Sequence, residues 1–291
     1  MLVHRLYKKG RHAGVLFFCL AFAGNAFAQS DLVFEQVSGN VWMVSGGGYA
    51  NVSILAGSGR ALVVDSKRPE HGDAIRDKAR ELSGGSVQYL VNGHEHPDHT
   101  DGNAGFGDAG ATIIAHEEVR RILAAGQRGG PPAPAAALPG ITIADDGALT
   151  LHFDGEVVHV MHMRPAHSPA NLLVFFENAN VMHLGDLFSP ERYPVVAGGT
   201  IDGFIADDER VLAMANADTR FIPGNGVVTG RQEVEAYLNM VKTVRSRVQQ
   251  LIAAGKSSEE VVAAAPTAEF DATWGDPARF LAALYQELSG N

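Results

Sequence analysis

The sequence predicts an α+β fold in which two packed β-sheets are covered by helices. Short runs that are apolar, or that alternate apolar and polar residues, occur in groups separated by glycine-containing turns. Segments with helical spacing lie between and after these groups instead of following every strand. Strict alternation of strand and helix would have predicted one parallel sheet, so the grouped order favours two layers of sheet.

The first half of the chain contains both kinds of segment. Residues 33–44 and 52–65 alternate apolar and polar side chains between glycine clusters, which predicts paired strands. Helical spacing at residues 73–82 ends at Gly84-Gly85, a common helix stop. Further strands are expected at 87–91 and 112–115, a helix at 117–125, and a surface loop in the Gly-, Pro- and Ala-rich stretch 126–140.

The second half returns to strands and then ends in helices. Strands are expected at residues 141–143, 149–153, 157–161, 172–176 and 181–184. Helices are expected at 201–215 and 233–253, with two more short helices within 258–288. No internal repeat is visible, and residues 29–291 are expected to form one domain.

The first 28 residues have the layout of a cleaved secretory signal. Basic residues, the last of them Arg11, precede an apolar run at residues 13–24. Ala26-Phe27-Ala28 then places small residues at the two positions that a signal peptidase reads. An uncleaved anchor is the alternative, but the run is short for a bilayer span. The mature chain is therefore expected to begin near Gln29 and to be periplasmic or secreted.

The charge of the mature chain limits its partners. Removal of the signal takes away basic residues and no acidic one, which changes the formal net charge from −10 to about −14. The single cysteine, Cys19, lies inside the signal, so the mature chain would contain none. A strongly acidic surface disfavours nucleic acids and anionic membranes as partners. A small-molecule substrate is therefore expected, with no membrane span after cleavage and an oligomeric state that the sequence leaves open.

The segment His94-Glu95-His96-Pro97-Asp98-His99 concentrates potential metal ligands. Imidazole nitrogen and carboxylate oxygen are the ligands that zinc and similar divalent ions prefer. Pro97 argues against a helix through the segment, and Asp98 stands where a helical H-E-x-x-H zinc site requires histidine. An extended backbone after the preceding strand is expected to point His94, His96 and Asp98 to one side, with His99 at the turn. The pattern predicts a metal site on a loop.

This H-x-H-x-D-H pattern resembles the signature of the metallo-β-lactamase superfamily, and three later segments resemble its further motifs in the same order. They are residues 164–168 around His167, residues 183–186 ending in Asp186, and residues 221–226 around position 225. The resemblance covers nearly the whole mature chain. It implies a four-layer αβ/βα sandwich with the metals in a cleft at one edge of the two sheets.

The resemblance also implies a role for each ligand. His94, His96 and His167 would hold a first ion, Asp98 and His99 a second, and Asp186 would bridge the two or bind the second. The implied cofactor is one or two zinc ions. Water between the metals would become hydroxide, because zinc can lower the pKa of bound water to about 7. Asp98 is the candidate catalytic residue, since it would orient that hydroxide for attack on a carbonyl or similar centre.

Other histidines are scattered over the predicted strands and helices. Most are expected to be surface residues or hydrogen-bonded structural residues. His116 and His183 lie at strand ends near motif segments, so either one is a candidate to support the metal ligands from behind.

The resemblance breaks at Asn225, where the family has its last histidine ligand. The flanking Pro223-Gly224 and Gly226 are intact, so the alignment of the segment holds. An amide oxygen is a weaker ligand for zinc than imidazole, so the second site is expected to be weakened, empty or tuned to a harder ion. A mononuclear or inactive centre is the alternative to a working enzyme with a weakened second site.

The resemblance implies a zinc-dependent hydrolase that uses a metal-bound hydroxide on an ester, lactone, thioester or lactam. A metallo-β-lactamase proper is an alternative, although Gly185-Asp186 resembles the broader hydrolase branches, because lactamases usually lack that aspartate. The acidic charge disfavours a nuclease branch, and the sequence leaves no flavin- or iron-binding domain for an oxidoreductase branch. A catalytically weakened periplasmic metal-binding protein is the remaining alternative, and the substrate itself stays open.

Overall fold

The computed structural model of the protein describes residues 32–48 and 50–290. The predicted secretory signal, residues 1–28, therefore lies outside the described residues. Across the described ranges, no helix combines the length and the apolar character needed to cross a membrane.

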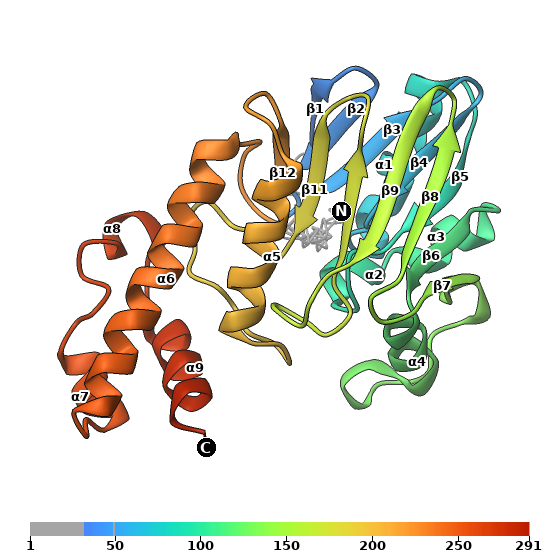
Figure 1. Ribbon diagram of the computed structural model, residues 1–291. Coiled ribbons are helices and arrows are strands. Elements are labelled where there is room, and N and C mark those ends of the chain that lie inside the picture. Colours follow the sequence, from blue (N-terminus) through green and yellow to red (C-terminus); the bar gives the residue numbers. More distant parts are fainter. Residues whose placement is uncertain (1–31, 49, 291) are drawn as a thin grey trace, which may run out of the picture.

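Two sheets form the centre of the fold (Figure 1). Among the described residues, the first sheet contains, in spatial order, β1 (Val33–Ser38), β2 (Val41–Ser45), β3 (Val52–Ala56), β4 (Arg60–Val64), β5 (Ser86–Val91), β6 (Thr112–His116) and β7 (Ile141–Ile143). The second contains β12 (Arg220–Pro223), β11 (Val181–Gly185), β10 (Leu172–Phe176), β9 (Glu156–His162) and β8 (Ala148–Phe153). Strands β1 to β4 pair antiparallel and β4 to β7 parallel, whereas β8 to β11 pair antiparallel and β12 joins β11 in parallel.

The helices lie on the outer faces of the sheets and around one edge. They are α1 (Pro69–Ser83), α2 (Pro97–Thr100), α3 (Asn103–Asp108), α4 (Glu117–Ala125), α5 (Ile201–Met214), α6 (Arg231–Ala253), α7 (Ser258–Ala263), α8 (Asp271–Trp274) and α9 (Ala278–Ser289). Helix α1 starts at Pro69, whose fixed φ suits a first helical position, and ends at Gly84 in the left-handed region with φ 73°. The structure therefore extends the expected helix at 73–82 by four residues toward the N-terminus.

Alternation along the strands builds the layers. In β4, Leu62 belongs to the apolar cluster between the two sheets, whereas Val63 belongs to the cluster under α1. In β10, Val174 faces the first sheet, and Leu173 joins the cluster that contains α5, α6 and α9 side chains such as Val241. The resulting order is helix, sheet, sheet, helix (Figure 1), which confirms the expected pair of sheets covered by helices.

Further details differ from the sequence expectation. The segment 126–140 contains two short 3₁₀ turns at Gln127–Gly129 and Ala135–Ala137 instead of being loop throughout. The tail contains α7, α8 and α9, where two helices were expected. Strand β12 was not expected, because it has four residues and forms by pairing with β11, a contact that local sequence does not encode.

Several strands end at one edge of the sandwich. Strands β4 and β5 run parallel, so the residues that follow them, Asp65 and Gly93, emerge together, and the Gly93 N–H donates to Asp65 Oδ1 at 2.7 Å. Strands β11 and β12 also run parallel, so Asp186 and Gly224 emerge together from the second sheet. A hydrogen bond from the Asn51 N–H to the Gly224 carbonyl, 2.7 Å long, joins the two sheets at this edge.

Candidate metal centre

Four potential ligands from three separate segments meet at this edge. One ligand atom each from His94, His96, His167 and Asp186 lies within 4.8 Å of the other three. His96 Nδ1 is 2.9 Å from both His94 Nε2 and His167 Nε2. Asp186 Oδ2 lies 3.3 Å from His167 Nε2 and 3.9 Å from His94 Nε2. Ligand atoms around a tetrahedral zinc ion with bonds near 2.0–2.1 Å are roughly 3.3 Å apart, so this set has the dimensions of one metal site.

The rings are held so that their lone pairs point inward. The Nδ1–H of His167 donates to the Val195 carbonyl at 2.6 Å, which leaves the Nε2 lone pair facing His96 and Asp186. Burial, together with the nearby His99 and His167, lowers the pKa of His94 well below its ordinary value. Burial also lowers the pKa of His96. Neutral imidazole is the form that binds a metal ion.

A second half of the centre surrounds His99. Its Nε2 is buried and has no hydrogen-bond partner, yet it points between Asp98 Oδ2 at 3.8 Å and Asp186 Oδ1 at 3.6 Å. An orphaned buried nitrogen is costly unless something binds it. The two oxygens of Asp186 therefore face different partners, Oδ2 toward His167 and Oδ1 toward His99. The residues of the first half fit a divalent metal ion, and Asp186 turns its other oxygen toward His99.

Asp65 holds His99 from behind. The Asp65 Oδ2 atom lies 2.7 Å from His99 Nδ1 and 3.3 Å from His183 Nε2, and Ser53 Oγ lies 2.7 Å from His183 Nδ1. Burial opposes ionisation of Asp65, but His99 and His183 outweigh it and lower the pKa of that carboxyl to about 2. An ionised Asp65 keeps the proton of His99 on Nδ1 and leaves Nε2 free for a ligand. The sequence analysis singled out His183 but missed Asp65, whose only signal is its place at the end of a strand.

The expectation of an extended segment through Asp98 is wrong. The backbone turns into the short helix α2, whose N-cap residue is His96 and whose first helical residue is Pro97. Proline suits this first helical position because its missing N–H would have no helical partner there. The turn carries Asp98 away from His94 and His96 and places it beside His99, with its side chain 32% exposed.

The comparisons with known proteins agree with this geometry. The family model described as the metallo-beta-lactamase superfamily matches residues 45–243. The chain belongs to the metallo-β-lactamase superfamily. This membership confirms the resemblance drawn from the motifs and, with the layers described above, the αβ/βα sandwich.

The proteins similar to this chain carry different names. The chain is 25% identical over 213 residues to the 2,4-dinitroanisole O-demethylase subunit alpha of a Nocardioides species, which covers 72% of this chain and 62% of that relative. A metallo-beta-lactamase from Pontibacter korlensis superposes with a TM-score of 0.63 at 15% identity, covering 73% of this chain and 99% of that one. A double mutant of the sec-alkyl sulfatase PisA1 gives 0.70 at 17% identity, covering 89% and 50%. At these identities the two solved structures support the fold alone.

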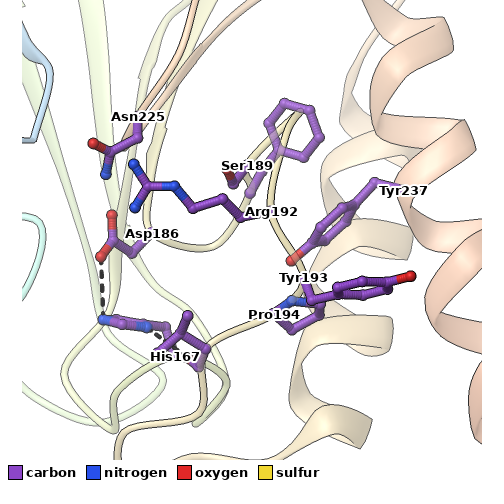
Figure 2. A pocket seen from close by; sticks show the side chains of 10 residues that line it. His167, Asp186, Ser189, Arg192, Tyr193, Pro194, Asn225 and Tyr237 are labelled. Atoms are coloured by element: carbon purple, nitrogen blue, oxygen red, sulfur yellow. Dashed lines mark hydrogen bonds and ion pairs between the residues drawn. The ribbon is translucent and has the colours of Figure 1, made fainter. Parts of the chain in front are cut away.

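Compared with the superfamily pattern, this member differs at Asn225. The side-chain amide of Asn51 donates to the carbonyls of Pro223 and Gly226, both at 2.9 Å, and so holds the turn that carries Asn225. A Cβ atom at Gly224 would lie 2.0 Å from Asp186 Oδ1, so the turn approaches the centre too closely for any other residue. Asn225 lines the same pocket as Asp186 and His167 (Figure 2), and its expected place in the second metal site stays a prediction.

That pocket opens beside the ligands and has about 330 Å³ of empty volume. Its other walls come mainly from the segment between β11 and α5, with Arg192, Tyr193 and Val195, and from Tyr237 of α6. Figure 2 shows Arg192 pointing toward the side of the pocket where Asn225 lies. The sequence analysis did not select any of these side chains, because no motif surrounds them.

Proposed function

We propose that the protein is a metal-dependent hydrolase of small molecules with an ester or ester-like bond. The observation that carries the proposal is the arrangement of Asp186, whose two oxygens face His167 on one side and His99 on the other, directly beside a pocket. Superfamily membership supports a hydrolytic reaction, because lactamases and a sulfatase share this fold. Zinc is the proposed metal, since three imidazoles with a carboxylate are a ligand set that suits it.

The bound metal would supply an activated water and polarise the bond to be broken. Around it, the protein's own groups position the reactants. Asp98 is partly exposed beside His99 and can accept the proton that an attacking water releases. Asp65 keeps His99 in one orientation through its 2.7 Å contact with Nδ1. Tyr237 lines the pocket. We propose that its hydroxyl donates a hydrogen bond to the negative charge that develops on the substrate.

The names of the relatives support the choice of bond. One is named as an O-demethylase and another as a sec-alkyl sulfatase, so both names describe removal of a group from oxygen. A β-lactam is a second class of substrate, favoured only by the likeness of the fold to metallo-β-lactamases. The pocket beside the ligands is small and suits a small substrate.

The test is turnover by purified mature protein whose metal content has been counted. The panel would contain a nitrophenyl ester, a nitrophenyl sulfate, a thioester, a lactone, an aryl methyl ether and a chromogenic cephalosporin. We expect hydrolysis of at least one ester-type compound, loss of that activity after dialysis against a chelator, and its return with zinc. Asp98→Asn should lower kcat by roughly 100-fold or more while the protein still binds metal. Turnover that survives chelation, or none with any member of the panel, would overturn the proposal.

We also propose that the protein is exported. The basic start, the apolar run and Ala26-Phe27-Ala28 support cleavage before Gln29. N-terminal sequencing of protein from the periplasm or medium should begin near Gln29. Full-length protein in the cytosol would contradict export.

A further inference from the structure

The segment between β11 and α5 holds one of the candidate ligands. The Val195 carbonyl accepts from His167 Nδ1–H at 2.6 Å, and the Ala197 N–H donates to the His167 carbonyl at 2.7 Å. Both the ring and the backbone of His167 are therefore bound to this segment. Residues 187–200 contain no helix or strand, so their conformation depends on the side chains that pack against them.

The C-terminal helices anchor the segment at Tyr193. The Tyr193 side chain is buried, and its ring stacks on that of Phe280 in α9, with centroids 5.1 Å apart. Its hydroxyl donates to Asp271 Oδ1 in α8 at 2.8 Å. Burial, together with the hydrogen bond to Asp271, raises the pKa of Tyr193, so the hydroxyl keeps its proton and remains a donor. Figure 2 shows the ring of Tyr193 pointing away from His167 and Asp186.

A second contact anchors the end of the segment. Glu287 of α9 accepts from the Ile201 N–H at 2.6 Å and from the Asp202 N–H at 3.0 Å, at the start of α5. The first N–H groups of a helix have no partner inside the helix, so this carboxylate satisfies two of them. Val195 lies between Tyr193 and Ile201 in sequence. The C-terminal helices therefore hold the stretch that carries the Val195 carbonyl on both sides.

These anchors come from outside the part of the chain that the family model matches. That match ends at residue 243, whereas α7 begins at Ser258 and α8 and α9 follow it. The contacts of Tyr193 with Asp271 and Phe280 are therefore not part of the matched pattern.

We propose that Tyr193 is a positioning residue of the metal centre. Its hydrogen bond to Asp271 fixes the Val195 carbonyl, which orients the His167 ring, so the C-terminal helices help to set the affinity for zinc. The proposal rests on the metal centre of the proposed function and on no particular substrate. Tyr193 acts through Val195 and His167 and takes no part in the chemical step.

Zinc titration of variants of the whole protein tests this assignment. Loss of a direct partner of a ligand lowers metal affinity by about 10- to 100-fold, and Tyr193 acts one step farther away, so we expect Tyr193→Phe to weaken zinc binding by roughly 3- to 10-fold. Asp271→Ala should weaken it equally, and the double variant no more than either single variant, because all three lack the same hydrogen bond. Asp271→Asn keeps an acceptor oxygen and should bind zinc within about twofold of the unmodified protein.

Tyr285→Phe is the matched control. The Tyr285 hydroxyl, in α9, donates to the Lys256 carbonyl at 3.2 Å and not to the segment that holds His167. This variant also loses one tyrosine hydroxyl from the C-terminal helices, and its zinc affinity should stay within about twofold of the unmodified protein. A purely structural role would lower the Tm of Tyr193→Phe and leave its zinc affinity equal to that of the control.

Amide hydrogen exchange in zinc-free protein separates this proposal from the proposed function. The Ala197 N–H should exchange at least about threefold faster in Tyr193→Phe, the effect of losing one ordinary hydrogen bond, and at an unchanged rate in Tyr285→Phe. An unchanged Ala197 rate, or a zinc affinity that falls no further than in the control, would overturn the assignment. If the unmodified protein binds no zinc, the metal centre of the proposed function fails, whereas faster exchange at Ala197 still supports the hold of Tyr193 on the His167 segment.

Discussion

Two clusters of histidine and aspartate lie among the residues that the structure describes, and they differ in how their ring nitrogens are hydrogen-bonded. The second consists of His116, Asp145 and His162, whose ligand atoms also lie within 4.8 Å of one another. The rings of His116 and His162 stack with centroids 4.3 Å apart, and His116 Nε2 is 3.1 Å from Asp145 Oδ1. By residue type and spacing alone, the two clusters look alike.

The direction of the hydrogen bonds distinguishes them. In the second cluster, His162 Nδ1 accepts from the Asp146 N–H at 2.9 Å, so the proton is on Nε2 and donates to the Pro169 carbonyl at 2.9 Å. His116 Nδ1 likewise accepts from the Glu118 N–H at 3.3 Å, which caps α4. In the first cluster, His167 donates from Nδ1 and keeps Nε2 free. The ring nitrogens of the second cluster are thus used in hydrogen bonds to the backbone, and the cluster joins β6 of one sheet to β9 of the other.

The largest expected effect is on metal content. Replacing His167 by Ala should lower zinc affinity by at least about 100-fold, because it removes one of the converging nitrogens. The matched variant in the second cluster, His162→Gln, should retain the zinc content of the unmodified protein. Atomic absorption after dialysis of both variants gives the answer. Equal loss of zinc in the two variants would mean that the second cluster also holds metal.

Within the first cluster, the two halves are expected to differ in affinity. Asn225→His should strengthen binding of a second zinc ion by roughly tenfold or more, because imidazole is the better ligand for zinc. Asn225→Ala is the control, and it should change the second affinity little if the amide is a weak ligand. Metal counting during a zinc titration measures both. If the unmodified protein already retains two ions as tightly as the histidine variant, the second half is not weakened by Asn225.

The segment between His162 and His167, which joins the two clusters, is held by the buried side chain of Asp207. Asp207 Oδ1 accepts from the Arg164 N–H at 3.0 Å, between His162 and His167 in sequence. Burial raises the pKa of Asp207 to about 7. The unfolded chain therefore releases this proton near pH 4 while the folded chain keeps it until about pH 7, so stability decreases as pH rises through that window and stays lower above it.

Asp207→Asn keeps an oxygen that can accept from the Arg164 N–H and removes the titrating carboxyl group. We expect its Tm to exceed that of the unmodified protein by about 2–4 °C at pH 8, and the difference to shrink toward pH 4. Zinc content should not change, since Asp207 only supports the segment. A difference that stays constant with pH would show that ionisation of Asp207 does not act on stability.

The smallest expected effect is on the pH dependence of Tm, and it comes from His116 in the second cluster. Burial, together with His162 and against the pull of Asp145, lowers the pKa of His116. Above the ordinary histidine pKa of about 6.5, neutral His116 costs the folded protein no stability. As pH falls below that value, the unfolded chain takes up the proton more readily than the folded one, so the free energy of unfolding decreases. His116→Gln should flatten this part of the Tm profile by about 2 °C near pH 5.5. An unchanged slope below pH 6.5 would exclude His116 as its source.

The sequence by itself predicted two packed sheets covered by helices and selected most of the candidate ligands. Periodicity placed helix α4 at its observed bounds, and the motifs selected His94, His96 and His167, which the fold brings together. Such features are local, since strand alternation and ligand type depend on neighbouring residues along the chain. Motif order also placed Asn225 beside Asp186, as the pocket shows.

Only the tertiary structure decided which polar groups act together. Asp65 reaches His99 because β4 and β5 are parallel neighbours, and Arg192 enters the pocket because the segment after β11 folds back beside Tyr237. Whether a histidine nitrogen carries a proton or a free lone pair depends on backbone groups far away in sequence or in another strand, as with His167 and the Val195 carbonyl. Residue type therefore nominates a ligand, but the partner on the far side of each ring determines whether it can bind a metal ion.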